Sequence, residues 1–132
     1  MDISLNPGAP RSPDYTRAVS AAIPEAVRVL NHATIDRPGD ALGWPSTADA
    51  VIRDLGLFAQ RLPQFLDQIR EWLMDEYSAG RVEGVNAHAA LAVAGARLRD
   101  AAAIAARLEN ALANAAVATS TLSAPYSEDE EG

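Results

Sequence analysis

The sequence contains no cysteine, which excludes disulfides, cysteine-ligated zinc, iron–sulfur clusters and a thiol nucleophile. Lysine is absent too, so the 11 basic residues are all arginines, set against 18 acidic residues for a net charge of −7. A general nucleic-acid binder needs an excess of basic side chains to neutralise phosphates, so we expect no nucleic-acid partner. There is no run of 18 apolar residues and no basic, apolar signal segment at the N-terminus. We therefore expect a cytoplasmic protein with no membrane partner.

The length of 132 residues suits one domain, and composition divides the chain into three parts. Residues 1–11 carry two prolines and a glycine, which predicts a disordered N-terminal arm. Residues 123–132 include four consecutive acids, which predicts a disordered acidic tail. The intervening residues, 12–122, are rich in alanine and form the expected helical domain.

The first predicted helix spans residues 13–33. Ser12 is a suitable N-cap, and the proline after it fits the first helical position, where a missing N–H has no intrahelical partner. Pro24 lies inside the run, where it removes a backbone donor and clashes with the preceding turn. Because the apolar spacing continues across Pro24, we expect a kinked helix or two abutting short ones. A turn-forming segment, 36–40, then follows.

The longest apolar pattern predicts a second helix over residues 46–78. Ser46 and Asp49 resemble a capping box at its start, and Gly80 is suited to end the helix in the left-handed conformation. Pro63 falls opposite the apolar stripe, so we expect it to face solvent and bend the helix. The stripe repeats every seven residues and comprises Val51, Leu55, Phe58, Leu62, Phe65, Ile69 and Trp72, flanked by Ile52, Leu66 and Leu73.

A third helix is expected over residues 87–119, with Asn86 as its N-cap. It matches the second helix in length and follows a short loop, which predicts an antiparallel hairpin about 50 Å long. The bulky stripe of the second helix should interdigitate with the smaller stripe of the third. This smaller stripe comprises Leu91, Ala94, Leu98, Ala101, Ala105, Leu108, Leu112 and Ala115, with Ile104 beside it.

These elements define an all-α fold: a long antiparallel helical hairpin with a shorter, kinked N-terminal helix packed on it, forming a three-helix bundle with disordered termini. One short helix cannot cover the far half of such a hairpin, so part of the bulky stripe should remain exposed. We therefore expect self-association, most simply as a homodimer, with a different protein partner as the alternative. The expected interface comprises Phe58, Phe65, Ile69, Trp72 and Leu73.

No sequence pattern carries catalytic chemistry. The nucleophile elbow, the glycine-rich phosphate loop and the HExxH zinc motif are all absent. Neither His32 nor His88 has a second histidine three or four residues later, so we expect structural or surface roles for both. Asp67 and Glu71 are expected to form a solvated charged face with Arg70. The sequence thus favours a non-catalytic interaction protein, not an enzyme, with no metal and no cofactor.

Two further functions remain open. A pocket near Pro24, Trp44 and Pro63 would suit an enzyme or a small-molecule binder. An acidic regulator that mimics nucleic acid would carry its acids on one face of the folded domain. The arginines of the third helix are interrupted by Asp100 and Glu109, which favours a solvated face over a phosphate-binding track.

The layout of residues 46–130, a helical hairpin followed by Tyr126-x-x-x-Glu130, resembles the small helical-hairpin substrates of type VII secretion. Those substrates carry a Tyr-x-x-x-Asp/Glu signal after the second helix. The Trp-x-Gly turn of that family is absent, and the loop between the helices here is Ala79–Gly84. The resemblance implies secretion by a route that is independent of a signal peptide, with Tyr126 and Glu130 as the signal.

A second resemblance rests on the segment Arg61–Gln68 together with Trp72 and Leu73. These residues resemble small alanine-rich helical proteins of actinobacteria that have no assigned function. The similarity extends over all three expected helices. It implies an all-helical fold and no particular activity.

Overall fold

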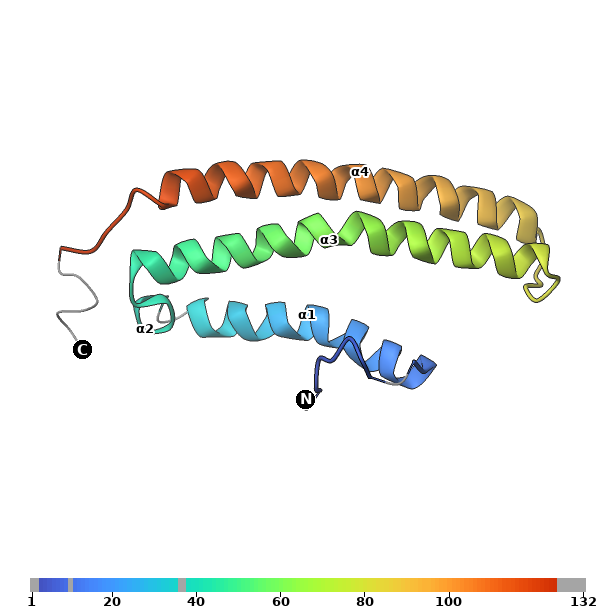
Figure 1. Cartoon of the computed structure of the whole chain (residues 1–132), viewed down its shortest axis with the longest axis horizontal. Coiled ribbons are helices and arrows are strands. Elements are labelled where there is room, and N and C mark those ends of the chain that lie inside the picture. The colour runs from blue at the N-terminus through green and yellow to red at the C-terminus, as the bar shows by residue number, and fades with distance from the viewer. Residues whose placement is uncertain (1–2, 10, 36–37, 126–132) are drawn as a thin grey trace. The chain divides into compact units, whose positions relative to one another are not determined.

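The computed structural model describes residues 3–9, 11–35 and 38–125, and every regular element within these ranges is a helix (Figure 1). The expected all-α fold is therefore confirmed. The chain divides into two compact units, Met1–Trp44 and Pro45–Gly132, and each is described by itself. The four helices are α1 (Pro13–Ile35), α2 (Pro38–Leu42), α3 (Pro45–Ser78) and α4 (Ala87–Thr119).

In the first unit, α1 begins where its capping residues predict. The backbone N–H of Tyr15 donates to the Ser12 hydroxyl at 3.1 Å, which confirms the expected N-cap. The Tyr15 hydroxyl also donates to the carbonyl of Ser4 at 2.6 Å, which ties the preceding arm to the first turn. The helix continues through Pro24 as one element, ends two residues later than expected and contains no buried residue.

The segment expected to be a turn after α1 contains a single helical turn, α2, in contact with α1. Gly43 follows α2 with a φ of +71°, a left-handed conformation that glycine adopts without steric cost. Trp44 is half-buried, and its backbone N–H donates to the carbonyl of Leu42 at 2.7 Å.

In the second unit, α3 and α4 run antiparallel and pack against each other along their length (Figure 1). The predicted hairpin is thus confirmed. Helix α3 begins at Pro45, one residue earlier than expected, because proline suits the first position of a helix. Ser46 consequently lies within the first turn, and the prediction that it serves as N-cap is wrong.

Helix α3 ends in the predicted glycine cap. Gly80 has a φ of +78°, and its N–H donates to the carbonyl of Tyr77 at 3.0 Å. The N–H of Arg81 donates to the carbonyl of Glu76 at 2.9 Å, which completes a Schellman motif. The Arg81 side chain also pairs with the Glu76 carboxylate through two hydrogen bonds of 2.6 and 3.1 Å. Backbone and side chain together fix the point at which the chain turns back.

Helix α4 begins at the expected residue but without the expected side-chain cap. Asn86 occupies the N-cap position with φ 57° and ψ 38°, and its side chain makes no capping hydrogen bond. A capping side chain normally reaches the first turn from an extended backbone. The left-handed backbone of Asn86 serves instead to complete the turn into α4.

The line along which α3 and α4 contact each other, which we call the seam, contains small residues. A Cβ placed on Gly56 would lie 3.9 Å from the Cβ of Leu112, and one placed on Gly95 would lie 3.6 Å from the Cδ of Arg70. The Cβ–Cβ distance at Gly56 shows that the two backbones approach closely there, whereas at Gly95 the neighbouring atom belongs to the long Arg70 side chain. The buried residues of the described chain are three alanines, all in this hairpin: Ala59, Ala105 and Ala116.

The predicted packing of bulky side chains against slim ones is wrong. Phe65 and Trp72 are 45% and 60% exposed, so they do not fill the seam. Successive residues of a helix are rotated by about 100° about its axis. Because Ala59 faces α4, the stripe that contains the preceding residue, Phe58, points well away from α4. Pro63, four residues after Ala59, lies on the seam side and is half-buried, contrary to the expectation that it faces solvent. Aromatic side chains in the seam would force apart helices that Gly56 and Ala59 allow to approach.

Arg70 forms the expected ion pair with Asp67, but its side chain lies on the seam and is largely buried, contrary to the expectation of a solvated face. Its stem packs over Gly95, where an added Cβ would make an ordinary contact 3.6 Å from the Arg70 Cδ. Its Nε is buried, donates no hydrogen bond within the described chain and lies 3.9 Å from the Asp67 carboxylate. At this level of the hairpin the contact between the helices thus involves the long Arg70 stem in addition to small residues.

Side-chain contacts join the two helices at both ends of the hairpin. At the open end, the Thr119 hydroxyl of α4 donates to Asp49 of α3 at 2.5 Å, and Arg53 donates to the same carboxylate at 2.8 Å. The hydrogen bonds from Arg53 and Thr119 lower the pKa of Asp49. At the loop end, the rings of Tyr77 and His88 lie 5.9 Å apart. Both ends thus reinforce the same antiparallel register.

Candidate interaction surface

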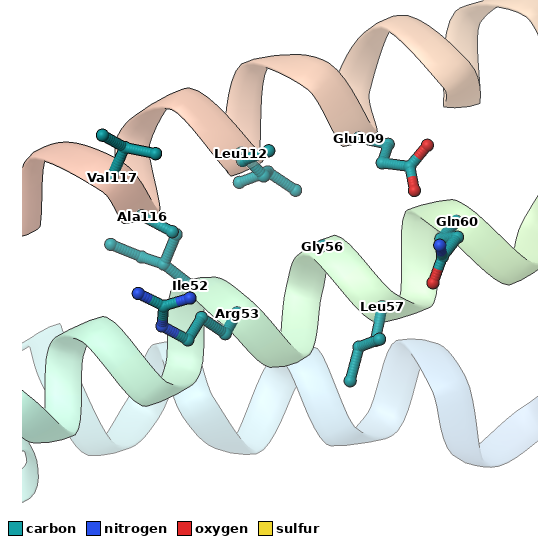
Figure 2. Close-up of a pocket in the computed structure, with 10 residues that line it drawn as sticks. Ile52, Arg53, Gly56, Leu57, Gln60, Glu109, Leu112, Ala116 and Val117 are labelled. Carbon is teal, nitrogen blue, oxygen red and sulfur yellow. The ribbon is translucent and has the colours of Figure 1, made fainter. Parts of the chain in front are cut away.

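One side of the hairpin carries a shallow groove of about 450 Å³ (Figure 2). Gly56 leaves space at its centre, and Leu112 points into that space from α4. Glu109 and Gln60 lie at one end of the groove, and Arg53 lies nearer the other. The lining residues are Ile52, Arg53, Gly56, Leu57 and Gln60 of α3 with Glu109, Leu112, Ala113, Ala116 and Val117 of α4.

The groove offers little chemistry. The Arg53 guanidinium is held by Asp49, so its Nε is already engaged. The remaining polar side chains, Gln60 and Glu109, come from different helices and make no hydrogen bond within the described residues. A catalytic centre requires a nucleophile or base that is positioned by a further group, and the groove presents no such arrangement.

The groove lining also identifies what lies on the opposite side of the seam. In an antiparallel pair of helices, each flank of one helix lies next to the same flank of the other. Arg53 of α3 and Ala113 of α4 both line the groove, so they identify the flank of each helix that lies on the groove side. The other flank of α3 is the predicted bulky stripe, and it meets the flank of α4 that carries Ile104 and Leu108. We call this second surface the aromatic face: Val51, Leu55, Phe58, Leu62, Phe65, Ile69 and Trp72 of α3 with Ala101, Ile104, Leu108, Ala111 and Ala115 of α4.

The aromatic face is extensively exposed. Phe58 is 41% and Ile104 54% exposed, in addition to the exposed Phe65 and Trp72. Together with Leu55 and Leu108, these side chains present roughly 600 Å² of apolar surface, since an aromatic side chain alone carries about 150–250 Å². The largest apolar patch on a typical monomer is about 300–600 Å², and patches at or above that range are often binding sites.

Four of the five interface residues predicted from the sequence share the aromatic face. Phe58, Phe65 and Trp72 recur every seven residues, and Ile69 lies beside them. Leu73 does not belong to this group, because it is in phase with Ala59 and half-buried on the seam. The other predicted functional residues, Tyr126 and Glu130, lie outside the described residues.

Sequence reasoning missed the contribution of α4 to this face. Ile104 and Leu108 were expected to pack against the bulky stripe from across the seam, yet they lie beside it on the same surface. The available signal was the spacing of Gly56, Ala59 and Pro63, which places small residues on one line of α3. Such a line facing an alanine-rich helix is typical of close helix packing.

No group of three or more metal-binding side chains comes together in residues 3–9, 11–35 and 38–125. Likewise, none of the helices in these ranges is both long enough and apolar enough to cross a membrane. The expected absence of metal, cofactor and catalytic activity remains a prediction.

Comparison of the chain with known protein families, with curated proteins and with solved structures finds no match. The resemblances to type VII substrates and to actinobacterial helical proteins therefore remain predictions from sequence. What is known of the site comes from the hairpin alone: a small-residue seam, a shallow groove on one side and a large apolar face on the other.

Proposed function

We propose that this chain is a non-catalytic helical interaction protein that works in the cytoplasm and docks through its aromatic face, most simply as a homodimer. The exposed apolar stripe along α3 carries the proposal. Six large side chains leave roughly 600 Å² of apolar surface in water, and removing it on association would be favourable at about 25 cal/mol per Å². A docked surface explains why large apolar residues repeat every seven positions on a face that does not close the hairpin.

The polar side chains support a docking role over a regulatory or enzymatic one. Six acids in the described chain each pair with a nearby arginine, in α1, in α3 and its following loop, and in α4, whereas a nucleic-acid mimic needs unpaired acidic side chains. The groove is open and its arginine is engaged with Asp49, so it lacks the enclosed apolar pocket of a small-molecule site.

Two adjacent residues provide a matched test of this function. Phe58 and Leu57 are 41% and 43% exposed but lie on opposite sides of the hairpin. We expect Phe58→Asp to shift the mass measured by light scattering toward the 13.9 kDa monomer, because it places a charge in the apolar contact. Leu57→Asp should leave the mass of the assembly unchanged, and both variants should keep the helical circular dichroism of the parent chain.

The alternative results are also informative. A parent chain that is a monomer at tens of micromolar would contradict the homodimer. Equal loss of association in both variants would show that the aromatic face is not the contact surface.

The antiparallel hairpin also supports a second candidate function, the type VII-like secreted factor. Helix α4 ends at Thr119, and the Tyr126-x-x-x-Glu130 motif follows it as in that family. Export by this route predicts that Tyr126→Ala keeps the protein in the cells of its native host while the parent chain reaches the medium. Equal amounts of both chains in the medium would remove this candidate.

A further inference from the structure

The outer edge of the aromatic face carries charges of both signs. Asp54 and Arg61 are seven residues apart on α3, on the side remote from α4 and directly beside Phe58 and Phe65. Neither side chain forms an ion pair with another residue of the described chain. Because about 10 Å of helix separates them, they do not neutralise each other within one copy.

This pattern is self-complementary about Phe58. Arg61 lies three residues after Phe58 and Asp54 lies four residues before it. If two α3 helices run antiparallel with Phe58 on the twofold axis, each Arg61 comes level with the partner's Asp54 to within one residue, about 1.5 Å. Symmetry makes the same pair twice, once at each side of the axis.

The apolar residues agree with this register. Leu55 lies three residues before Phe58 and Leu62 lies four residues after it. Leu55 of one copy therefore meets Leu62 of the other copy. Val51 and Phe65 are each seven residues away, so the smallest residue of the stripe meets a large one. At the axis, the two Phe58 rings meet each other.

The next register along the helix is disfavoured by charge. With Phe65 on the axis, Asp54 of one copy comes level with Asp75 of the other, and these two like charges repel each other. Arg61 then meets Gln68 instead of a carboxylate. The edge charges therefore select the Phe58 register over the Phe65 register.

We propose that the occupant of the aromatic face is a second copy of this chain, related by a twofold axis at Phe58, with two antiparallel α3 helices at the centre of the contact. This inference rests on the proposed function, since it requires the aromatic face to be a docking surface. Trp72 lies 14 residues from the axis, level with residue 44 of the other copy and just outside its α3. Without Trp72, the large side chains of each copy contribute roughly 450 Å² together with the alanines of α4, about half of the 800 Å² per partner of a standard stable interface.

Disulfide trapping tests the axis directly, because the chain has no native cysteine. We expect Phe58→Cys to form a covalent dimer on mild oxidation, because the two copies of residue 58 face each other across the axis. Phe65→Cys should not cross-link efficiently, since its two copies would lie about 21 Å apart, beyond disulfide reach. Cross-linking at residue 65 but not at residue 58 would overturn the register while leaving the docking face intact. A parent chain that never dimerises would overturn both proposals.

Charge exchange tests the paired edges in the full chain. Arg61→Asp alone replaces two attractions by two repulsions, so the dissociation constant measured by analytical ultracentrifugation should rise roughly tenfold. Adding Asp54→Arg restores opposite charges across the axis and should bring the constant back toward that of the parent. A double variant as weak as the single one would overturn the pairing, because charges seven residues apart do not interact within one helix. Circular dichroism of each variant checks that the helices remain folded.

Discussion

At the scale of single residues, small side chains decide how α3 and α4 meet. Gly56 lies close to Leu112, and the buried residues of the described hairpin are alanines, so two long helices approach without a bulky core. Dispersion contacts are individually weak and depend on close approach, so this narrow seam gains stability from its length. The large apolar side chains are consequently available on another face.

Substitution of Gly56 separates the effect of backbone freedom from the effect of space. Gly56→Ala should stabilise the protein by about 0.5–1 kcal/mol, because glycine is costly in a helix interior and the new Cβ would make an ordinary contact 3.9 Å from Leu112. Gly56→Leu should destabilise it by about 1–3 kcal/mol, since the larger side chain overpacks the seam. Urea unfolding followed by circular dichroism measures both. A destabilising alanine would contradict the assigned geometry.

At the scale of elements, the ends of α3 set the hairpin. The glycine cap at Gly80 reverses the chain, and the bidentate pair between Arg81 and Glu76 holds the turn. Asp49 and Thr119 join the two helices at the other end. Contacts at the two ends thus fix the register of helices about 50 Å long.

The glycine cap predicts that alanine substitution at Gly80 changes the free energy of unfolding more than alanine substitution at Ser78. Gly80→Ala should lower the free energy of unfolding by about 1–2 kcal/mol, because a φ of +78° strains any residue that has a Cβ. Ser78→Ala, in the helical part of the same turn, should change it by less than about 0.5 kcal/mol. Thermal unfolding of the three proteins provides the comparison. Equal effects of the two substitutions would show that the Schellman motif contributes little.

Much of each element could be predicted from sequence because its signals are local. Ser12 and Gly80 each act on one helical turn, so the start of α1 and the end of α3 were predicted at the correct residue. The limits of α4 were also predicted correctly. Short α2 was not found, because its five residues are dominated by turn-forming types.

At the scale of the whole molecule, acid should weaken the hairpin at both ends. Asp49 and Glu76 each have a pKa below the ordinary value, through hydrogen bonds from Arg53 and Thr119 for Asp49 and from Arg81 for Glu76. A carboxyl group whose pKa is lower in the folded than in the unfolded state stabilises the fold above its unfolded pKa. That contribution disappears as the pH falls through the folded pKa.

We therefore expect the midpoint temperature of thermal unfolding to decrease as the pH is lowered from about 5 to about 3, the range in which ordinary carboxyl groups titrate. The variant Asp49→Asn with Glu76→Gln should show a weaker dependence over the same range, because both shifted carboxyl groups are gone. Circular dichroism melts at several pH values provide the measurement. An unchanged pH dependence in the double variant would assign the acid sensitivity to other groups.

The sequence by itself determined that the chain is helical, where its long helices lie and that two of them form an antiparallel hairpin. These features depend on capping residues, apolar periodicity and loop length, which act over a few turns. Only the tertiary structure decided which stripe of α3 meets α4. Two adjacent stripes are apolar, and periodicity alone favours the larger one. Close packing favours the line through Gly56 and Ala59 instead, because only small residues let the two backbones approach.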